Sequence, residues 1–259
     1  MSLSQGMIGV LKDKIVFVTG ASSGIGAACA EAFSGQGAKI LMAARRIERL
    51  ETLAKRLPTK CHCVQLDVTN HEQVQEVIRS LPSGWQEIDI LLNNAGLSRG
   101  LDRLHEGKRQ DWEEMIDTNV KGLLYITRVV VPGMLTRGGG HIINIGSTAG
   151  HEVYPGGNVY CATKHAVRAL TQGLKMDLLG TPLRVSLVDP GLVETEFSVV
   201  RFHGDTERAR AVYKGIQPLT PRDVAEVVLF CATRPPHVNI NDVILMPIAQ
   251  ASATLVSRK

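Results

Sequence analysis

Tyr160 and Lys164 stand four residues apart in the segment Tyr-Cys-Ala-Thr-Lys, so their side chains would lie one turn apart on one face of a helix. A free tyrosine has a pKa of about 10 and is a poor acid or base at neutral pH. A neighbouring positive charge favours the phenolate, and lowering the pKa by about three units corresponds to roughly 4 kcal/mol. We therefore predict that Lys164 lowers the pKa of Tyr160 into the range useful for general acid–base catalysis.

Two further polar residues could act beside this pair. Ser147 follows the predicted strand His141–Ile145, where its hydroxyl could hold a substrate oxygen beside Tyr160. Asn119 lies within the predicted helix Trp112–Met134, where it could break the helical hydrogen bonding locally and anchor a water that relays protons to Lys164. The predicted catalytic residues are therefore Asn119, Ser147, Tyr160 and Lys164.

The scaffold that must position these residues follows from the hydrophobic pattern. Short apolar runs of strand length, most of them apolar on both faces, occur at Lys14–Thr19, Lys39–Ala44, His62–Leu66, Ile88–Asn93, His141–Ile145, Leu183–Val188 and Asp242–Met246. Helical patterns lie between them, at Ile25–Ser34, Ile47–Leu57, Glu72–Ser80, Trp112–Met134, Val159–Leu179 and Arg222–Thr233. This alternation predicts an α/β protein with a single-domain Rossmann fold, a doubly wound seven-stranded parallel sheet with helices on both faces. We expect one domain over residues 1–259, with a substrate lid at about 193–216 and a C-terminal tail at about 247–259.

Composition narrows the class of partner. The chain has 259 residues and a net charge of +4, and its 29 lysines and arginines are scattered rather than gathered in a stripe. Aromatic residues make up only 4%, which leaves few side chains to stack on bases. No run of about 18 apolar residues predicts a membrane span, and no segment near the N-terminus resembles a signal peptide. We therefore expect no nucleic-acid or membrane partner.

The five cysteines form an odd set without a C-x-x-C pair, which fits a reducing cytoplasm. Cys61 and Cys63 would point to the same face of a strand. Only His62 and His71 lie near enough to complete a metal site. We therefore expect no metal, a buried and reduced cysteine pair, and a cytoplasmic location.

A glycine-rich turn, Thr19-Gly-Ala-Ser-Ser-Gly-Ile-Gly26, joins the first predicted strand to the first helix. Gly20 permits the tight turn, Gly24 lets the backbone approach a pyrophosphate, and Gly26 lets the helix lie close to the strand. The start of the helix offers free N–H groups and a positive dipole end to phosphates. The position of this turn between a strand and a helix predicts a dinucleotide site.

The end of the second predicted strand distinguishes two forms of the dinucleotide. The chain carries Arg45 and Arg46 there, with no carboxylate before Glu48. Guanidinium groups suit a 2′-phosphate, whereas a carboxylate would bind a free ribose diol, so NADP is favoured over NAD. The alternative is a solvated basic start to the next helix.

Two other strand ends complete the predicted cofactor site. Asp67 and Val68 follow the third strand and could hydrogen-bond to and pack against adenine. Asn93-Asn94-Ala95-Gly96 ends the fourth strand, where small residues let the backbone pass close to a ribose.

Taken together, these motifs resemble the short-chain dehydrogenase/reductase family in its single-domain form. The glycine turn, the N-N-A-G segment, the four catalytic candidates and Pro190-Gly191 follow the family's order over nearly the whole chain. The resemblance implies contacts of Thr195 with the nicotinamide carboxamide and of Lys164 with the nicotinamide ribose. It also assigns to the cofactor Ser22, Ser23, Ile25, Tyr160, Pro190, Gly191 and Val193. It implies a homotetramer that uses the helices at 112–134 and 159–179, whose length already predicts apolar surface that the sheet cannot cover.

The C-terminal third carries Pro190-Gly-Leu-Val-Glu-Thr-Glu-Phe-Ser198, then residues 200–205, Pro218-Leu-Thr220, Met246-Pro247 and Gln250-Ala-Ser252. These segments resemble one subgroup, the NADP-dependent 3-hydroxy acid (serine or allo-threonine) dehydrogenases, with the sulfoacetaldehyde reductases as relatives. Arg201 follows the nicotinamide loop and could bind a carboxylate or sulfonate with both guanidinium nitrogens, unless it pairs with Glu194 or Glu196. Tyr154 and Gln250 could add hydrogen bonds to the same anion. The predicted substrate residues are Ser147, Tyr154, Tyr160, Arg201 and Gln250.

The sequence thus predicts an NADP-dependent oxidoreductase that transfers a hydride reversibly between nicotinamide and a small hydroxy acid or its carbonyl form. The acid could be a 3-hydroxy acid, serine-like, or a sulfonated alcohol. One alternative is a general short-chain carbonyl or 3-oxoacyl reductase without acid specificity. Another is a redox-sensing protein that binds the nucleotide without chemistry, and it would have a broken set of catalytic residues. The identity of the acid, the preferred direction and the choice between dimer and tetramer stay open.

Overall fold

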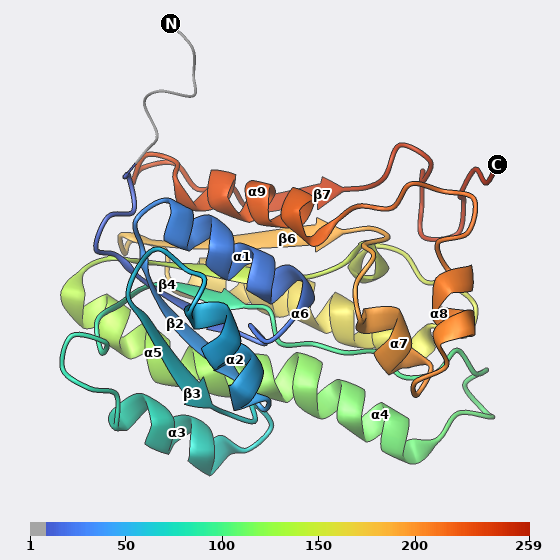
Figure 1. The fold of residues 1–259 in the computed structure, drawn as a ribbon, viewed down its shortest axis with the longest axis horizontal. Helices are drawn as coiled ribbons and strands as arrows, with labels where there is room; N and C mark the ends of the chain where they lie inside the picture. The colour runs from blue at the N-terminus through green and yellow to red at the C-terminus, as the bar shows by residue number, and fades with distance from the viewer. Residues whose placement is uncertain (1–8) are drawn as a thin grey trace, which may run out of the picture.

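The computed structural model describes residues 9–259, in which seven parallel strands form one sheet in the order β3-β2-β1-β4-β5-β6-β7 (Figure 1). The strands are β1 (Ile15–Thr19), β2 (Lys39–Ala44), β3 (Cys61–Gln65), β4 (Ile88–Asn93), β5 (Gly140–Ile145), β6 (Leu183–Pro190) and β7 (Asp242–Leu245). The chain winds outward from β1 to β3, returns to β4 beside β1, and winds outward again to β7. The predicted fold class is confirmed. The domain predicted for residues 1–259 includes residues 1–8, which lie outside the described part.

Helices cover both faces of the sheet, and the alternation along β1 shows why. Val16 and Val18 belong to one hydrophobic core, which includes α1 (Gly24–Gly35), α2 (Ile47–Ala54) and α9 (Pro221–Ala232). Ile15 and Phe17 point the other way, into a second core with α3 (His71–Arg79), α5 (Leu123–Arg137) and the end of α6 (Asn158–Asp177). Figure 1 shows α1, α2 and α9 on one side of the sheet. Because both faces are covered, the carboxyl ends of the strands are left to form the site.

The predicted helix Trp112–Met134 is divided in the structure. Residues Arg109–Ile116 form α4, Asp117–Gly122 form a π-helical turn (η1), and Leu123–Arg137 form α5. A π-turn changes the hydrogen-bonding pattern without ending the helix, so the apolar periodicity gave no sign of the division. The predicted helix is thus interrupted by a π-turn, and the predicted local break at Asn119 is confirmed.

The segment expected to form a lid contains two short helices, α7 (Phe197–Arg201) and α8 (Thr206–Ala211), which the sequence pattern did not predict. The C-terminal tail returns to this segment, and the Lys259 N–H donates to the Gly215 carbonyl at 3.0 Å. In Figure 1 the C-terminus accordingly lies near α8.

Cys61 and Cys63 are half-buried rather than buried, which corrects the prediction. They lie on β3, an edge strand that has a neighbour on one side only, so its cover is incomplete. The five cysteines are free thiols. Within residues 9–259, no helix is both long and apolar enough to cross a membrane.

Candidate active site

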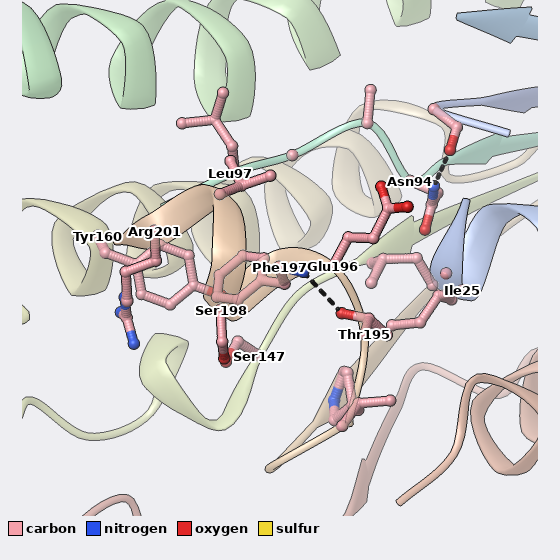
Figure 2. Close-up of a pocket in the computed structure, with 18 of the residues that line it drawn as sticks. Ile25, Asn94, Leu97, Ser147, Tyr160, Thr195, Glu196, Phe197, Ser198 and Arg201 are labelled. Atoms are coloured by element: carbon pink, nitrogen blue, oxygen red, sulfur yellow. Dashed lines mark hydrogen bonds between the residues drawn. The ribbon is translucent and has the colours of Figure 1, made fainter. Parts of the chain in front are cut away.

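A pocket with a volume of about 470 Å³ opens at the carboxyl ends of the strands. It is lined by every residue predicted for cofactor, substrate or catalysis except Gly26 and Asn119, which lie directly behind its wall. The sequence prediction named residues from the N-terminal turn to the C-terminal tail, and the fold brings them to one place. Figure 2 shows part of this lining, with Arg201, Tyr160 and Phe197 at one end and Ile25 at the other.

The glycine turn has the geometry that its residues predict. Gly20 (φ +66°) and Gly24 (φ +54°) adopt left-handed backbone conformations, and a Cβ on Gly20 would lie 2.8 Å from the Ala95 Cα. A Cβ on Gly26 would lie 2.5 Å from Asn94 Nδ2, so only glycine allows α1 to lie this close to β4. Ser23 precedes α1 without capping it through its side chain, which leaves the first N–H groups of the helix directed at the pocket. This turn fits a pyrophosphate.

Arg46 lies against the same turn. Its Nη2 donates to the hydroxyls of Ser22 and Ser23, each at 3.1 Å, and its Nη1 lies 3.2 Å from the Glu196 carboxylate. Arg45 is exposed at the pocket rim. Two guanidinium groups and two hydroxyls in one place form a donor set that suits a phosphate. These residues therefore fit the 2′-phosphate of NADP.

Arg49 is a further member of this group that the sequence did not indicate. Arg49 binds Glu196 through Nη1 at 2.8 Å, so Glu196 bridges Arg46 and Arg49. The hydrogen bond from Arg49 and the charges of both arginines lower the pKa of Glu196, against the effect of burial. The pairing joins the segment before α7 to α2, and nothing local in the sequence indicated it.

The N-N-A-G segment is fastened to the glycine turn. Asn94 Nδ2 donates to the carbonyls of Thr19 (2.9 Å) and Gly20 (3.2 Å), and Thr19 Oγ1 accepts from the N–H groups of Asn94 and Ala95, both at 3.1 Å. Asp67 and Val68 line the same pocket. Asp67 Oδ1 accepts from the Thr69 N–H and hydroxyl. The residues predicted for the ribose and the adenine are therefore brought to one pocket.

Asn119 is held by backbone and side-chain partners. Its Oδ1 accepts from the Leu97 N–H at 2.8 Å, and its Nδ2 donates to the Leu97 carbonyl (2.8 Å) and to Thr163 Oγ1 (3.0 Å). The amide thus joins the loop after β4 to the π-turn and to α6. Its predicted role in a proton relay stays a prediction.

Tyr160 and Lys164 lie on α6, where both are buried. Lys164 Nζ donates to the Ile145 carbonyl at 2.9 Å and lies 6.0 Å from the Tyr160 ring centroid. Burial lowers the pKa of Lys164 to about 8, and the charge of Asp189 opposes this shift.

The prediction that Lys164 lowers the pKa of Tyr160 needs correction. Burial, assisted by Tyr154, raises the pKa of Tyr160, while the charge of Arg201 and a hydrogen bond with Ser147 oppose the rise. Lys164 is directed towards Ile145 instead. Among the groups of this chain, the principal positive charge on Tyr160 therefore comes from Arg201.

Arg201 ends α7 and enters the pocket. Its Nε donates to Ser98 Oγ at 2.9 Å, its Nη2 donates to the Tyr154 hydroxyl, and its guanidinium carbon lies 5.2 Å from the Tyr160 ring centroid. Arg201 thus does not pair with Glu196, which binds Arg46 and Arg49. Figure 2 shows the Arg201 side chain beside the Tyr160 ring.

Gln250 lines the pocket and is held by backbone partners. Its Oε1 accepts from the Leu192 N–H at 2.8 Å, and its Nε2 donates to the Ser252 carbonyl at 3.1 Å. The buried amide supports the turn at Gly191, where a Cβ would collide with Oε1. Its predicted contact with the substrate anion stays a prediction.

Arg99 connects α7 to α4. Its Nε binds Glu114 of α4 at 2.7 Å and its Nη1 donates to the Val200 carbonyl of α7 at 2.6 Å. The Gly100 N–H donates to the Arg201 carbonyl at 2.9 Å. The last two residues of α7 are therefore both held by hydrogen bonds from residues 99 and 100.

The fold and this arrangement of groups define a nucleotide-dependent oxidoreductase. Residues 14–205 match the model of the family described as short chain dehydrogenase. The chain belongs to this family, so the resemblance inferred from the motifs is confirmed.

Particular relatives have more specific names. The chain is 51% identical over 242 residues to the NADP-dependent 3-hydroxy acid dehydrogenase YdfG of Salmonella typhi, which covers 93% of this chain and 98% of that protein. It is 45% identical to the NADP-dependent 3-hydroxy acid dehydrogenase of Schizosaccharomyces pombe, over 96% of this chain and 98% of that protein. A solved structure described as the closed form of serine dehydrogenase complexed with NADP+ has a TM-score of 0.91, 50% identity, and coverage of 95% of this chain and 99% of that one. The predicted cofactor and class of reaction agree with these names.

Proposed function

We propose that this protein is an NADP-dependent dehydrogenase that oxidises small hydroxy acids and forms them in the reverse reaction. The observation that carries the proposal is the position of Arg201, which is fixed by Ser98 and Tyr154 with its guanidinium 5.2 Å from the Tyr160 ring. A substrate whose alcohol oxygen meets Tyr160 would place a short acidic arm against that guanidinium. The names of relatives 45–51% identical support this substrate class.

The reaction is assembled from groups of known position. NADP, when bound, supplies the acceptor and donor of the hydride. The Ser147 hydroxyl holds the substrate oxygen, and Tyr160 takes its proton during oxidation or returns one during reduction. Arg46, Ser22 and Ser23 hold the 2′-phosphate, while Lys164 and Asn119 fix the wall that the nicotinamide ribose meets. Arg201 and Tyr154 bind the acid group of the substrate. This contact places the substrate oxygen at the Tyr160 hydroxyl.

A substrate panel tests the acid specificity, and Arg201→Gln is the informative variant. We expect kcat/KM for L-serine, 3-hydroxypropionate and 3-hydroxyisobutyrate to fall about 30- to 100-fold, since a charge-assisted hydrogen bond is worth roughly 1.5–3 kcal/mol. A neutral alcohol of similar size should change less than about tenfold, because it loses only the effect of the Arg201 charge on Tyr160. Steady-state rates of NADPH formation measure both.

Arg208→Gln is the matched control, because Arg208 is an exposed arginine of the lid that stacks on Phe202 at 4.4 Å outside the pocket lining. It should leave both substrate classes unchanged. Equal losses for acids and neutral alcohols in Arg201→Gln would contradict the proposal and favour a general carbonyl reductase.

The assembly we propose is a homotetramer formed through the helices at 112–134 and 159–179. Supporting this, Leu124 on α5 is 42% exposed and Met176 on α6 is 74% exposed, although both are large apolar side chains. The free thiols also fit a cytoplasmic location, which we propose for the protein.

Light scattering after gel filtration is expected to give about four times the chain mass of 28.1 kDa. Leu124→Glu together with Met176→Glu should lower the measured mass, because a tetramer would bury both charges. Ile248→Glu, at a fully exposed residue of the C-terminal tail, serves as the control. A monomer for the unmodified protein would refute the assembly.

A further inference from the structure

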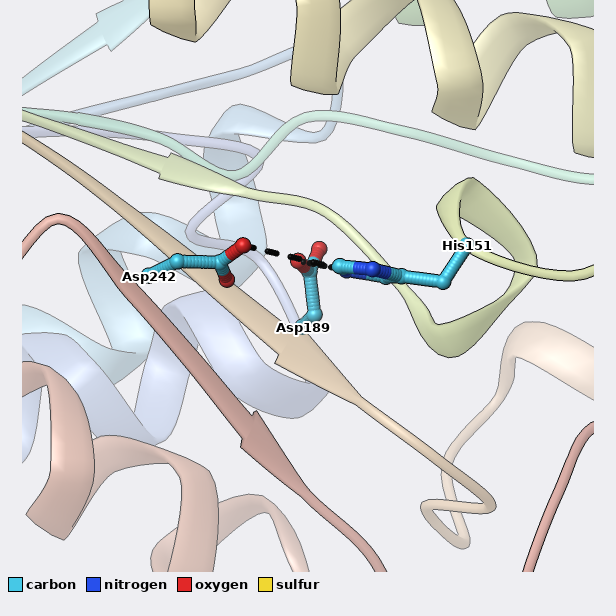
Figure 3. Close-up of side chains that lie close together, drawn as sticks. All are labelled: His151, Asp189 and Asp242. Carbon is cyan, nitrogen blue, oxygen red and sulfur yellow. Dashed lines mark hydrogen bonds and ion pairs between the residues drawn. The ribbon is translucent and has the colours of Figure 1, made fainter.

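Asp189 lies at the end of β6 with a fully buried carboxylate, and none of the roles above uses it. Its Oδ1 accepts the Ser147 N–H at 2.7 Å. Its Oδ2 lies 2.6 Å from His151 Nε2. Figure 3 shows His151 and Asp242 on either side of this carboxylate.

These two hydrogen bonds join one carboxylate to both ends of a short loop. The loop leaves β5 through Gly146, forms a 3-10 turn (η2, Thr148–Gly150), and ends at His151. A side chain on Gly146 would collide with Asp189 Oδ1, so glycine is what allows this approach. The carboxylate therefore sets the peptide plane from which the Ser147 side chain projects.

The charge of Asp189 also acts beyond the loop. It is the group that opposes the lowering of the Lys164 pKa by burial. Charged or titratable groups face Asp189 from three sides, namely His151 after η2, Asp242 at the start of β7, and Lys164 on α6. Arg168 of α6 lies 3.9 Å from Asp242 and balances that carboxylate.

The distances favour a hydrogen-bonded cluster over a metal site. Two ligand atoms on one tetrahedral ion, with bonds of about 2.0–2.1 Å, lie about 3.3 Å apart. The separation of 2.6 Å between His151 Nε2 and Asp189 Oδ2 is that of a short N–H···O bond. The cluster is thus complete without an ion.

We propose that Asp189, with His151 as its partner, is a positioning residue that holds the loop carrying Ser147. The proposal rests on the catalytic role of Ser147 proposed above. A loop that loses this anchor would let the hydroxyl move from the substrate oxygen, and a displacement of about 1 Å can cost on the order of 100-fold in rate.

Asp189→Ala tests the positioning role. With the acid of the panel above that the unmodified protein oxidises fastest, we expect kcat to fall about 30-fold. The Kd for NADPH, measured by fluorescence, should stay within about threefold. In a Ser147→Ala background the same substitution should cost less than about threefold, because the loop then holds no hydroxyl to position. Asp242→Asn, at an exposed cluster member that makes no hydrogen bond to Ser147, is the control and should keep kcat within twofold.

Asp189→Asn keeps the anchor and serves if the alanine variant does not fold. The amide can still accept from the Ser147 N–H and donate to a neutral His151, so both hydrogen bonds to the loop are kept. We therefore expect Asp189→Asn to keep kcat within about threefold, in contrast to Asp189→Ala.

The outcomes separate the two proposals. If Ser147→Ala keeps normal kcat, the catalytic role of Ser147 is wrong. If Ser147→Ala loses activity while Asp189→Ala stays within twofold of the unmodified protein, only the positioning role is wrong. Equal fractional losses in both backgrounds, or an equal loss of kcat in Asp189→Asn and Asp189→Ala, would likewise overturn the proposal.

Discussion

Tyr160→Phe is expected to lower kcat by about 1,000-fold or more while the Kd for NADP stays within about threefold. The substitution removes one hydroxyl that transfers the proton, and general acid–base catalysis contributes about 10²- to 10⁴-fold. The ring itself stays packed edge-on against Phe197, with 5.5 Å between centroids, so the pocket wall keeps its shape. Single-turnover rates and fluorescence titration with NADPH give the two quantities independently.

Tyr154→Phe provides the matched control for this experiment. It also removes one phenolic hydroxyl from the pocket, but this hydroxyl binds Arg201 rather than a reacting atom in the proposed mechanism. Its loss should therefore raise KM for acids more than it lowers kcat. Turnover near normal in Tyr160→Phe would refute the assigned proton transfer. Similar kcat losses in both variants would show that the Tyr160 hydroxyl contributes no more to turnover than the Tyr154 hydroxyl does.

The surroundings of Tyr160 fit the acid role proposed for it. Burial raises its pKa, so the free site holds a protonated phenol, and Arg201 from the lid segment opposes this rise. The same guanidinium that would bind the acid group therefore also sets the acidity of the phenol. Binding an acid would neutralise part of that charge and keep the proton on Tyr160 until a carbonyl oxygen can take it.

Local spacing was sufficient to predict much of the site. Tyr160 and Lys164 share a helix, and the glycine turn lies between a strand and a helix, so each motif carries its own geometry. Parallel strands also place their ends at one edge of the sheet, which brought Arg46 and Asn94 to the same pocket.

The remaining features depend on contacts between distant segments. Gln250 meets Leu192 across 58 residues, and Asp189 meets Ser147 across 42. A glutamine or aspartate has the same sequence signal whether it faces a ligand or a backbone N–H. The half-exposed Cys61 and Cys63 likewise depend on β3 being the edge strand, which periodicity does not reveal.

Exchanging both Arg45 and Arg46 for Gln should weaken NADP binding by about 100-fold or more and leave NAD binding within about threefold. Each guanidinium lost removes charge-assisted hydrogen bonds to a phosphate, worth roughly 1.5–3 kcal/mol, and 1.4 kcal/mol corresponds to tenfold. Because NAD lacks the 2′-phosphate, it loses no such partner. Titration of both nucleotides against both proteins measures the ratio.

Arg49→Gln is the control that separates the phosphate role from the general positive charge of α2. Arg49 binds the same Glu196 at 2.8 Å but does not line the pocket. In the double variant Arg49 still holds Glu196, so the attachment of the lid segment to α2 survives and cannot account for a loss of NADP. Removing Arg49 instead leaves Arg46 on Ser22 and Ser23, and NADP should bind within about threefold of normal. Equal losses of NAD and NADP in the double variant would show that the two arginines act on the fold or the lid rather than on the 2′-phosphate.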